Sequence, residues 1–256
     1  MGDTEISEQS YKLQQSCNEY NKKQGNLVGY NCPVCKNKGH VMFIDEEDGT
    51  TRVTNCKCGA VRKSLQMIKA SGLSSLLDSC TFATYKARDD WQKKAKESAI
   101  AFLNDHEGKW FYIGGQVGSG KTHICTAIVV DLLKKGIPAK YMKWRDEMST
   151  LMAIRFDEQE YNRQMNRWKR TKVLYMDDLF KADKLNAFEK NATFEILNAR
   201  YVDKSLITII SSEYTVGELM KIDEAIGSRI YERTRVYALD TGHDKQRNYR
   251  IYGGEA

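Results

Sequence analysis

The stretch that decides the fold is Gly115-Gln116-Val117-Gly118-Ser119-Gly120-Lys121-Thr122, which matches the GxxxxGK[ST] pattern of a phosphate-binding loop. A short apolar run, Trp110-Phe111-Tyr112-Ile113, precedes it and predicts a strand. Apolar residues then recur at helical spacing at Ile124, Ile128, Val129, Leu132 and Leu133. A strand, a glycine loop and a helix in this order are the context in which such a loop binds phosphates. The sequence therefore predicts a nucleotide-binding site.

The residues expected to contact the nucleotide run from Gly115 to His123. Glycines let the backbone N–H groups wrap the phosphates, and the N-terminus of the following helix adds a favourable dipole. Lys121 would bring a positive charge to the β- and γ-phosphates, and Thr122 would offer its hydroxyl to Mg²⁺. A glycine-rich turn with an incidental lysine is the alternative, and the surrounding pattern argues against it.

A second motif lies at residues 172–180, KVLYMDDLF, an apolar strand that ends in two acids. In phosphate-binding enzymes the first acid, here Asp177, holds Mg²⁺, and the second, Asp178, orients or deprotonates the attacking water. Residues 139–144 and 206–211 predict two more strands of a parallel α/β sheet. The extra strand and the lack of an NKxD guanine motif favour an additional-strand ATPase, with ATP rather than GTP as the nucleotide.

Four of the seven cysteines cluster, and they predict a zinc site. The apolar run Val41-Met42-Phe43-Ile44 and the stretch Thr51-Arg52-Val53-Thr54 flank an acidic turn that ends in Asp48-Gly49, which indicates a hairpin between the cysteine pairs. The pairs are Cys32 and Cys35, then Cys56 and Cys58. Four thiolates can close a tetrahedral zinc site with a structural role, so residues 26–62 are expected to form a zinc ribbon. Four unligated cysteines, or His40 in place of one thiolate, are the alternatives.

Composition excludes other classes of protein. The chain has 256 residues, is 41% hydrophobic and carries a net charge of +6, which permits contact with nucleic acid without requiring it. No apolar run approaches the length of a membrane span, and the N-terminus lacks the pattern of a signal peptide. We therefore expect a cytoplasmic protein with no membrane partner. Helices are expected near residues 1–25, 61–77 and 91–103.

Four stretches occur in order behind the cysteines: GQVGSGKT (115–122), VLYMDDLF (173–180), TIISSEY (208–214) and AIGSRIYER (225–233). Together they resemble the DnaC/DnaI-type replicative helicase loaders, which are AAA+ ATPases related to the transposition helper IstB and, more distantly, to the initiator DnaA. The resemblance covers about residues 80–252. Within this family, the arrangement of the chain looks most like that of a phage or prophage loader. It implies an AAA+ domain over residues 78–256, preceded by a helicase-binding domain with the zinc ribbon over residues 1–77.

The resemblance also implies roles for single residues. Lys121 and Thr122 match the Walker A pair, and Asp177 and Asp178 match the Walker B acids. AAA+ proteins usually have Glu as the second acid, so the shorter Asp178 suits slow hydrolysis and a nucleotide switch.

At two further places the role of single residues stays open, because the chain departs from the family pattern or offers more than one residue for the role. The family usually has Ser-Asn where this chain has Ser212-Glu213, so either Ser212 donates to the γ-phosphate or Glu213 handles water. Arg229 matches the arginine that family members project into a neighbour's ATP site, which implies self-association through these sites. Arg233 and Arg235 are rival candidates.

The function that the resemblance implies is ATP-dependent loading of a hexameric replicative helicase, with binding of single-stranded DNA. Candidates for DNA contact are Arg155, Tyr161, Arg163, Arg167, Trp168, Lys169 and Arg170, and at the basic C-terminal end Lys245, Arg247 and Arg250. A solvated helix face is the alternative for the first group, because acids at 157, 158 and 160 lie among them.

An IstB-like transposition helper that acts on duplex DNA is the main alternative function. A zinc-ribbon regulator is disfavoured, because the acidic tip at residues 45–48 would repel DNA phosphates. A metabolic P-loop kinase would need a substrate pocket and lid arginines.

Overall fold

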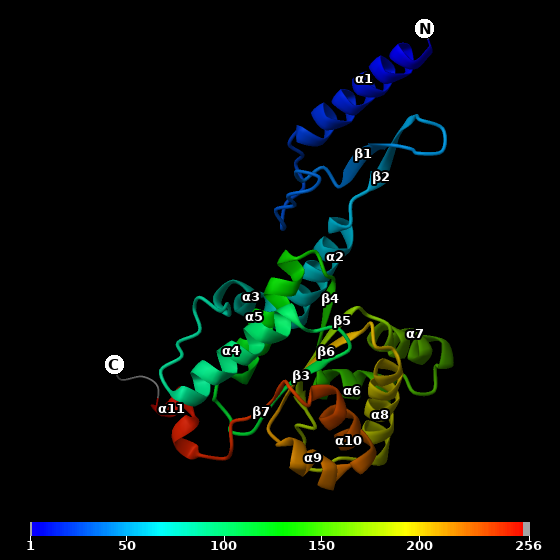
Figure 1. The fold of residues 1–256 in the computed structure, drawn as a ribbon. Helices are drawn as coiled ribbons and strands as arrows, with labels where there is room; N and C mark the ends of the chain where they lie inside the picture. Colours follow the sequence, from blue (N-terminus) through cyan, green and yellow to red (C-terminus); the bar gives the residue numbers. More distant parts are fainter. Residues whose placement is uncertain (1, 253–256) are drawn as a thin grey trace. The chain divides into compact units, whose positions relative to one another are not determined.

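The fold is described from a computed structural model, which describes the backbone of residues 2–252. It forms two compact units, Met1–Gln66 and Met67–Ala256 (Figure 1). The division into a helicase-binding domain over residues 1–77 and an ATPase domain over residues 78–256 stays a prediction. Among the described helices, none has the length and apolar character that crossing a membrane requires.

The first unit contains a long helix and a hairpin. Helix α1 (Gly2–Lys22) packs on β1 (His40–Ile44), which pairs antiparallel with β2 (Thr51–Asn55). The Asn21 side chain fastens the helix to the hairpin, because its amide donates to Met42 O at 2.8 Å and its Oδ1 accepts from Met42 N at 3.0 Å. The predicted hairpin is confirmed, and every residue of β2 is exposed.

The helical region after the hairpin is interrupted. Residues 61–77 are helical as predicted, but the helix is not regular: α2 (Cys58–Ile68) is followed by a π-helical turn, Lys69–Leu73, and then by α3 (Ser74–Ser79). Residues 69–73 read Lys-Ala-Ser-Gly-Leu, and glycine and serine are weak helix formers that favour such irregular turns.

The second unit is built on a five-stranded parallel sheet with the order β4-β5-β6-β3-β7. In chain order its strands are β3 (Trp110–Gly114), β4 (Ala139–Lys143), β5 (Val173–Leu179), β6 (Ile207–Ser212) and β7 (Ala238–Asp240). Strand β6 lies between β3, which leads into the phosphate loop, and β5, which ends in the two acids. This is the predicted additional-strand arrangement, and it is confirmed.

Helices cover both faces of this sheet, as Figure 1 shows for α4 and α5 on one side and α8 to α10 on the other. The helices are α4 (Asp90–Asn104), α5 (Lys121–Lys134), α6 (Trp144–Ala153), α7 (Glu158–Lys169), α8 (Ala187–Val202), α9 (Val216–Ile222), α10 (Glu224–Thr234) and α11 (Tyr249–Tyr252), with a short 3₁₀ turn at Lys245–Arg247. Trp110 and Tyr112 of β3 are fully buried in the core that the strands share with α6 to α10.

Because all five strands run in one direction, their carboxyl ends meet at one edge of the sheet. The segments after β3, β5, β6 and β7 therefore converge there, and ligands of open α/β sheets bind at this edge.

Candidate nucleotide-binding site

The phosphate loop connects β3 to α5 and uses glycines where the backbone turns left-handed. Gly115, Gly118 and Gly120 have φ angles of 107°, 75° and 89°. At Gly118 space is also restricted, because an added Cβ would lie 2.0 Å from Asn248 Oδ1. A left-handed backbone with such a close neighbour strongly favours glycine at this position.

Lys121 opens helix α5 and is buried. Its Nζ donates to Gly115 O at 2.8 Å and to Gln116 O at 2.7 Å, so the ammonium lies over its own loop. Burial lowers the pKa of Lys121, whereas the carboxylates of Asp178 and Glu213 raise it. The group is held where phosphates bound by the loop would meet it.

Asp177 is a buried carboxylate at the end of β5 that accepts several hydrogen bonds. Tyr175 and Tyr141 donate to it through their hydroxyls at 2.6 Å and 2.9 Å, and Ser211 also donates to it. Thr122 Oγ1 approaches the same carboxylate at 3.4 Å. The paired hydroxyl and carboxylate oxygens of Thr122 and Asp177 are the donor types that Mg²⁺ prefers.

Asp178 points into different surroundings from Asp177, because β5 is irregular between Met176 and Leu179. Asp178 adopts a left-handed φ of 54°. Its Oδ2 pairs with Lys181 Nζ at 3.0 Å, and the same ammonium pairs with Glu213 Oε1 at 2.8 Å. Burial lowers the pKa of Lys181, but the hydrogen bonds to both carboxylates raise it more, so the ammonium stays charged.

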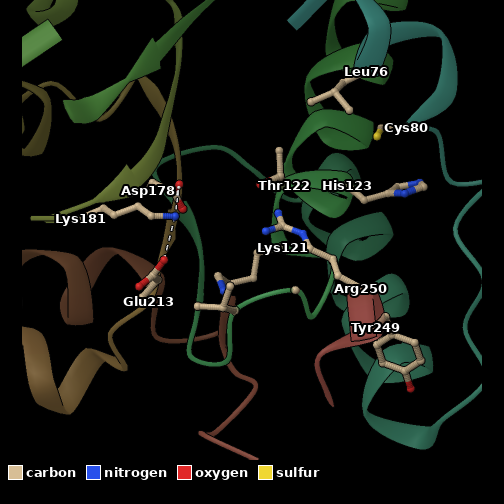
Figure 2. A pocket seen from close by; sticks show the side chains of 13 residues that line it. Leu76, Cys80, Lys121, Thr122, His123, Asp178, Lys181, Glu213, Tyr249 and Arg250 are labelled. Atoms are coloured by element: carbon tan, nitrogen blue, oxygen red, sulfur yellow. Dashed lines mark hydrogen bonds and ion pairs between the residues drawn. The ribbon is translucent and has the colours of Figure 1, made fainter. Parts of the chain in front are cut away.

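These groups line a cavity of about 320 Å³ over the phosphate loop (Figure 2). Its lining residues are Leu76, Cys80, Val117, Gly118, Gly120, Lys121, Thr122, His123, Asp178, Lys181, Glu213, Tyr249 and Arg250. In Figure 2, Lys181, Asp178 and Glu213 form one wall, while Thr122, His123 and Arg250 lie opposite.

A second cavity, of about 280 Å³, adjoins the first at the phosphate loop. Both are lined by Gly118, Gly120, His123 and Tyr249. The second also contains Tyr85, whose ring meets the His123 ring edge-on with 5.1 Å between centroids. Aromatic and backbone surface of this kind can receive a flat heterocycle beside the phosphates.

Other candidate residues lie elsewhere. Ser212 is buried and its hydroxyl donates to Leu179 O at 2.8 Å, so it ties β6 to β5, whereas Glu213 faces the cavity. Arg229 donates to Asn198 Oδ1 at 3.0 Å and does not line the cavity of its own chain.

Arg233 and Arg235, the two alternatives to Arg229 for contact with a neighbour's ATP site, differ in exposure. Arg233 is buried, with its guanidinium 5.6 Å from the Trp110 ring centre. Arg235 lies exposed at the end of α10.

The four cysteines of the first unit come together as predicted, with their sulfur atoms all within 4.8 Å of one another. Cys32 Sγ lies 3.7 Å from Cys56 Sγ, and Cys35 Sγ lies 3.5 Å from Cys58 Sγ. A tetrahedral site with zinc–sulfur bonds of about 2.3 Å has sulfur atoms about 3.8 Å apart, so the cluster fits this metal. His40 is not part of the cluster, and its ring lies 5.9 Å from that of Tyr20.

The chain forms the knuckle around Cys35 with left-handed turns at Lys36, Asn37 and Gly39. These turns aim the Gly39 amide at Cys35 Sγ, at 3.3 Å. Burial raises the pKa of Cys35, but hydrogen bonds from that amide and from the neighbouring thiols bring the pKa down to about 6. A thiolate is the form that binds metal.

One predicted DNA contact is wrong. Trp168 is fully buried, because Met165 and Trp168 form the inner face of α7, so its ring offers no stacking surface. The neighbouring cations keep some access: Arg167 lies over the outer side of that ring at 4.4 Å. Phe156, which was not singled out, is 86% exposed with the Arg155 guanidinium 4.3 Å from its ring centre.

Sequence reasoning missed several residues of the site. Lys181 lies three positions after Asp178, and this closeness in the chain is its sequence signal. Arg250 was considered for DNA, yet it lines the cavity because Tyr249 N donates to Gly118 O at 3.1 Å. Nothing local in the sequence indicates that this segment returns to the loop.

Comparison with known proteins identifies the family. A model of IstB-like ATP binding proteins matches residues 52–238, which is most of the chain and includes the loop, both acids and α10. Phage-like element PBSX protein XkdC of Bacillus subtilis (strain 168) is 29% identical over 238 residues, which cover 88% of this chain and 87% of XkdC.

Two further comparisons concern replication proteins. Replicative helicase loader DnaC of Escherichia coli (strain K12) is 23% identical over 208 residues, covering 80% of this chain and 83% of DnaC. A crystal structure of DnaI superposes with a TM-score of 0.54 at 24% identity, covering 65% of this chain and 92% of DnaI. This likeness shows a shared fold, and the predicted DnaC-like AAA+ architecture is confirmed.

Proposed function

The chain belongs to the family of IstB-like ATP binding proteins, and we propose that it is an ATPase that loads a replicative helicase onto single-stranded DNA. The observation that carries the proposal is the cavity that joins Lys121 and Thr122 of the phosphate loop to the acid at Asp178. The similarity of the chain to a protein named replicative helicase loader supports the choice of a helicase as partner.

ATP binds with its phosphates on the loop and its base in the adjoining cavity. Lys121 is already buried beside the loop, and it exchanges its contacts with the Gly115 and Gln116 carbonyls for phosphate oxygens. Phosphates are the stronger partners of an ammonium, because both groups are charged. The base lies among Tyr85, His123 and Tyr249, which line the second cavity.

Thr122 and Asp177 hold Mg²⁺, whose charge offsets that of the phosphates. The tyrosine hydroxyls and Ser211 fix the Asp177 carboxylate in one orientation. Such outer hydrogen bonds hold a ligand in place for a metal.

Hydrolysis needs a water molecule directed at the γ-phosphorus. Its oxygen forms a bond to that phosphorus, the bond to the β–γ bridging oxygen breaks, and ADP leaves with the electron pair. Asp178, at the cavity wall, accepts the proton of the water. Its short side chain is tied to Lys181, which suits slow turnover and a nucleotide switch.

Arg229 acts on the ATP of a neighbouring copy, so the active form is an oligomer. Its position away from its own cavity supports this role, as does its partial exposure on α10. The hydrogen bond to Asn198 and the Phe194 ring, whose centre lies 4.8 Å from the guanidinium, hold the Arg229 side chain in place when no neighbouring copy is bound.

The N-terminal region binds the helicase, and its zinc ribbon is held by the four cysteines. The AAA+ region binds single-stranded DNA, because the exposed Phe156 beside Arg155 offers a stacking surface and a positive charge together. The protein acts in the cytoplasm. Transposition help on duplex DNA is the second candidate function, and the name of the matching family model favours it.

A binding experiment distinguishes the two functions. We expect the wild-type protein to form a complex with the hexameric helicase of its host in the presence of ATP, measured by light scattering after size exclusion. The Lys121→Ala protein should lose the ATP response while it stays folded. ATP-dependent binding to duplex DNA, without a helicase complex, would establish the second candidate instead.

A further inference from the structure

The wall of the cavity formed by the ends of β5 and β6 carries two carboxylates, Asp178 and Glu213. Neither carboxylate can donate a hydrogen bond to a phosphate oxygen, and both repel a γ-phosphate. If these were the only charged groups there, ATP would bind less well than ADP. The same wall, however, carries Lys181 (Figure 2).

Lys181 lies between the two acids and reaches both of them. Its Nζ is 3.0 Å from Asp178 Oδ2 and 2.8 Å from Glu213 Oε1. An ammonium has three donors, so two can serve the acids while the third is directed elsewhere. The side chain is 47% exposed, and it lines the cavity opposite Arg250 and Thr122.

We propose that Lys181 is the residue that recognises the γ-phosphate, and that Glu213 is a positioning residue that holds the lysine at the end of β6. The inference rests on the proposed function, since it requires ATP in this cavity. Lys121 would meet the phosphates from the loop, whereas Lys181 would meet the terminal phosphate from the wall that carries Asp178, the acid assigned to the attacking water.

Through Lys181, Glu213 takes part in binding the γ-phosphate, which a carboxylate cannot do directly. As an acceptor it fixes the lysine, and the lysine supplies the positive donor to the nucleotide. The pair also ties the recognition of ATP to Asp178, because the same ammonium holds the acid that handles water.

The test compares affinities for ATP and ADP. Lys181→Met keeps the length of the side chain and removes its charge, and we expect it to weaken ATP binding by about 10- to 100-fold, as for the loss of a charge-assisted hydrogen bond. ADP binding should change less than about twofold, because ADP lacks the third phosphate. Lys181→Arg should retain most of the preference for ATP.

Two further variants sharpen the test. Lys184→Met is the matched control, because Lys184 is an exposed lysine outside the cavity lining, and it should leave both affinities unchanged. In the Lys181→Met background, Glu213→Asn puts an amide donor at the end of β6, and it should restore part of the preference for ATP. Thermal unfolding checks that each variant is folded.

The outcomes separate this role from the proposed function. A Lys181→Met protein whose ratio of ATP to ADP affinity equals that of the wild type overturns the role of Lys181 alone. Faster hydrolysis with an unchanged ratio would mean that Lys181 restrains Asp178, and this also overturns it. A wild-type protein that binds neither nucleotide would overturn the proposed function, and the role of Lys181 with it.

Discussion

Replacing Cys56 by serine should unfold the ribbon of the first unit and leave the ATP site intact. The reason lies in how little apolar packing surrounds the four cysteines. Among the described residues, Tyr30 and Val41 are the only partly buried apolar side chains packed against the four cysteines, and β2 is exposed throughout. Burying a valine fully contributes about 1.5–3 kcal/mol.

Zinc contributes far more than this packing. A structural zinc site stabilises small folds by about 10–16 kcal/mol at neutral pH. The cluster offers four thiolates at distances that suit a tetrahedral site, so Cys56→Ser removes one of the four bonds and leaves a neutral hydroxyl. Zinc content should fall from about one equivalent per chain to less than about a fifth of that.

The assay combines metal analysis with hydrogen exchange. In Cys56→Ser we expect the amides of β1 and β2 to exchange as in an unfolded peptide, while ATP affinity stays within about twofold of the wild type. Cys17→Ala is the matched control, because this thiol is buried in α1 of the same unit but lies outside the cluster. Full zinc content and slow exchange in Cys56→Ser would refute the reasoning, and so would equal loss of zinc in the control.

Three other predictions concern the second unit. Asp178→Asn should keep ATP affinity and slow hydrolysis by about 100-fold or more, as for the loss of a general base, and undiminished turnover would move water handling to Glu213. Arg229→Ala should bind ATP and lose the ATPase activity that DNA or the helicase stimulates, and mixing with Lys121→Ala should restore some activity. Hydrolysis that is independent of protein concentration and unaffected by Arg229→Ala would contradict the role in a neighbouring site. Arg250→Gln should weaken ATP binding by about tenfold, whereas weaker DNA binding with unchanged ATP affinity would assign Arg250 to the DNA path.

Much of the fold is predictable because local patterns and the fold agree. The buried strands are continuous apolar runs, and the phosphate loop carries its glycines where the backbone needs them. The cysteine cluster was predictable from spacing, since the hairpin between the pairs brings them together.

Helix α7 shows where sequence reasoning went wrong. Its basic residues drew attention to DNA, yet Tyr161, Met165 and Trp168 recur at the spacing of one helical face, and this face is packed against the core. The apolar periodicity was the stronger signal, because burying a tryptophan and a methionine stabilises the fold more than an exposed charge does.

The rest of the site depends on which strands are neighbours. Glu213 reaches Lys181, 32 positions earlier in the chain, only because β6 lies beside β5 with Ser212 opposite Leu179. A shift of β6 by one residue would move Glu213 by about 3.3 Å and turn its side chain to the other face. The ion pair between Glu213 and Lys181, 2.8 Å long, therefore depends on this register. The motifs thus identify the loop and the acids, whereas the cations that complete the cavity follow from the order and register of the sheet.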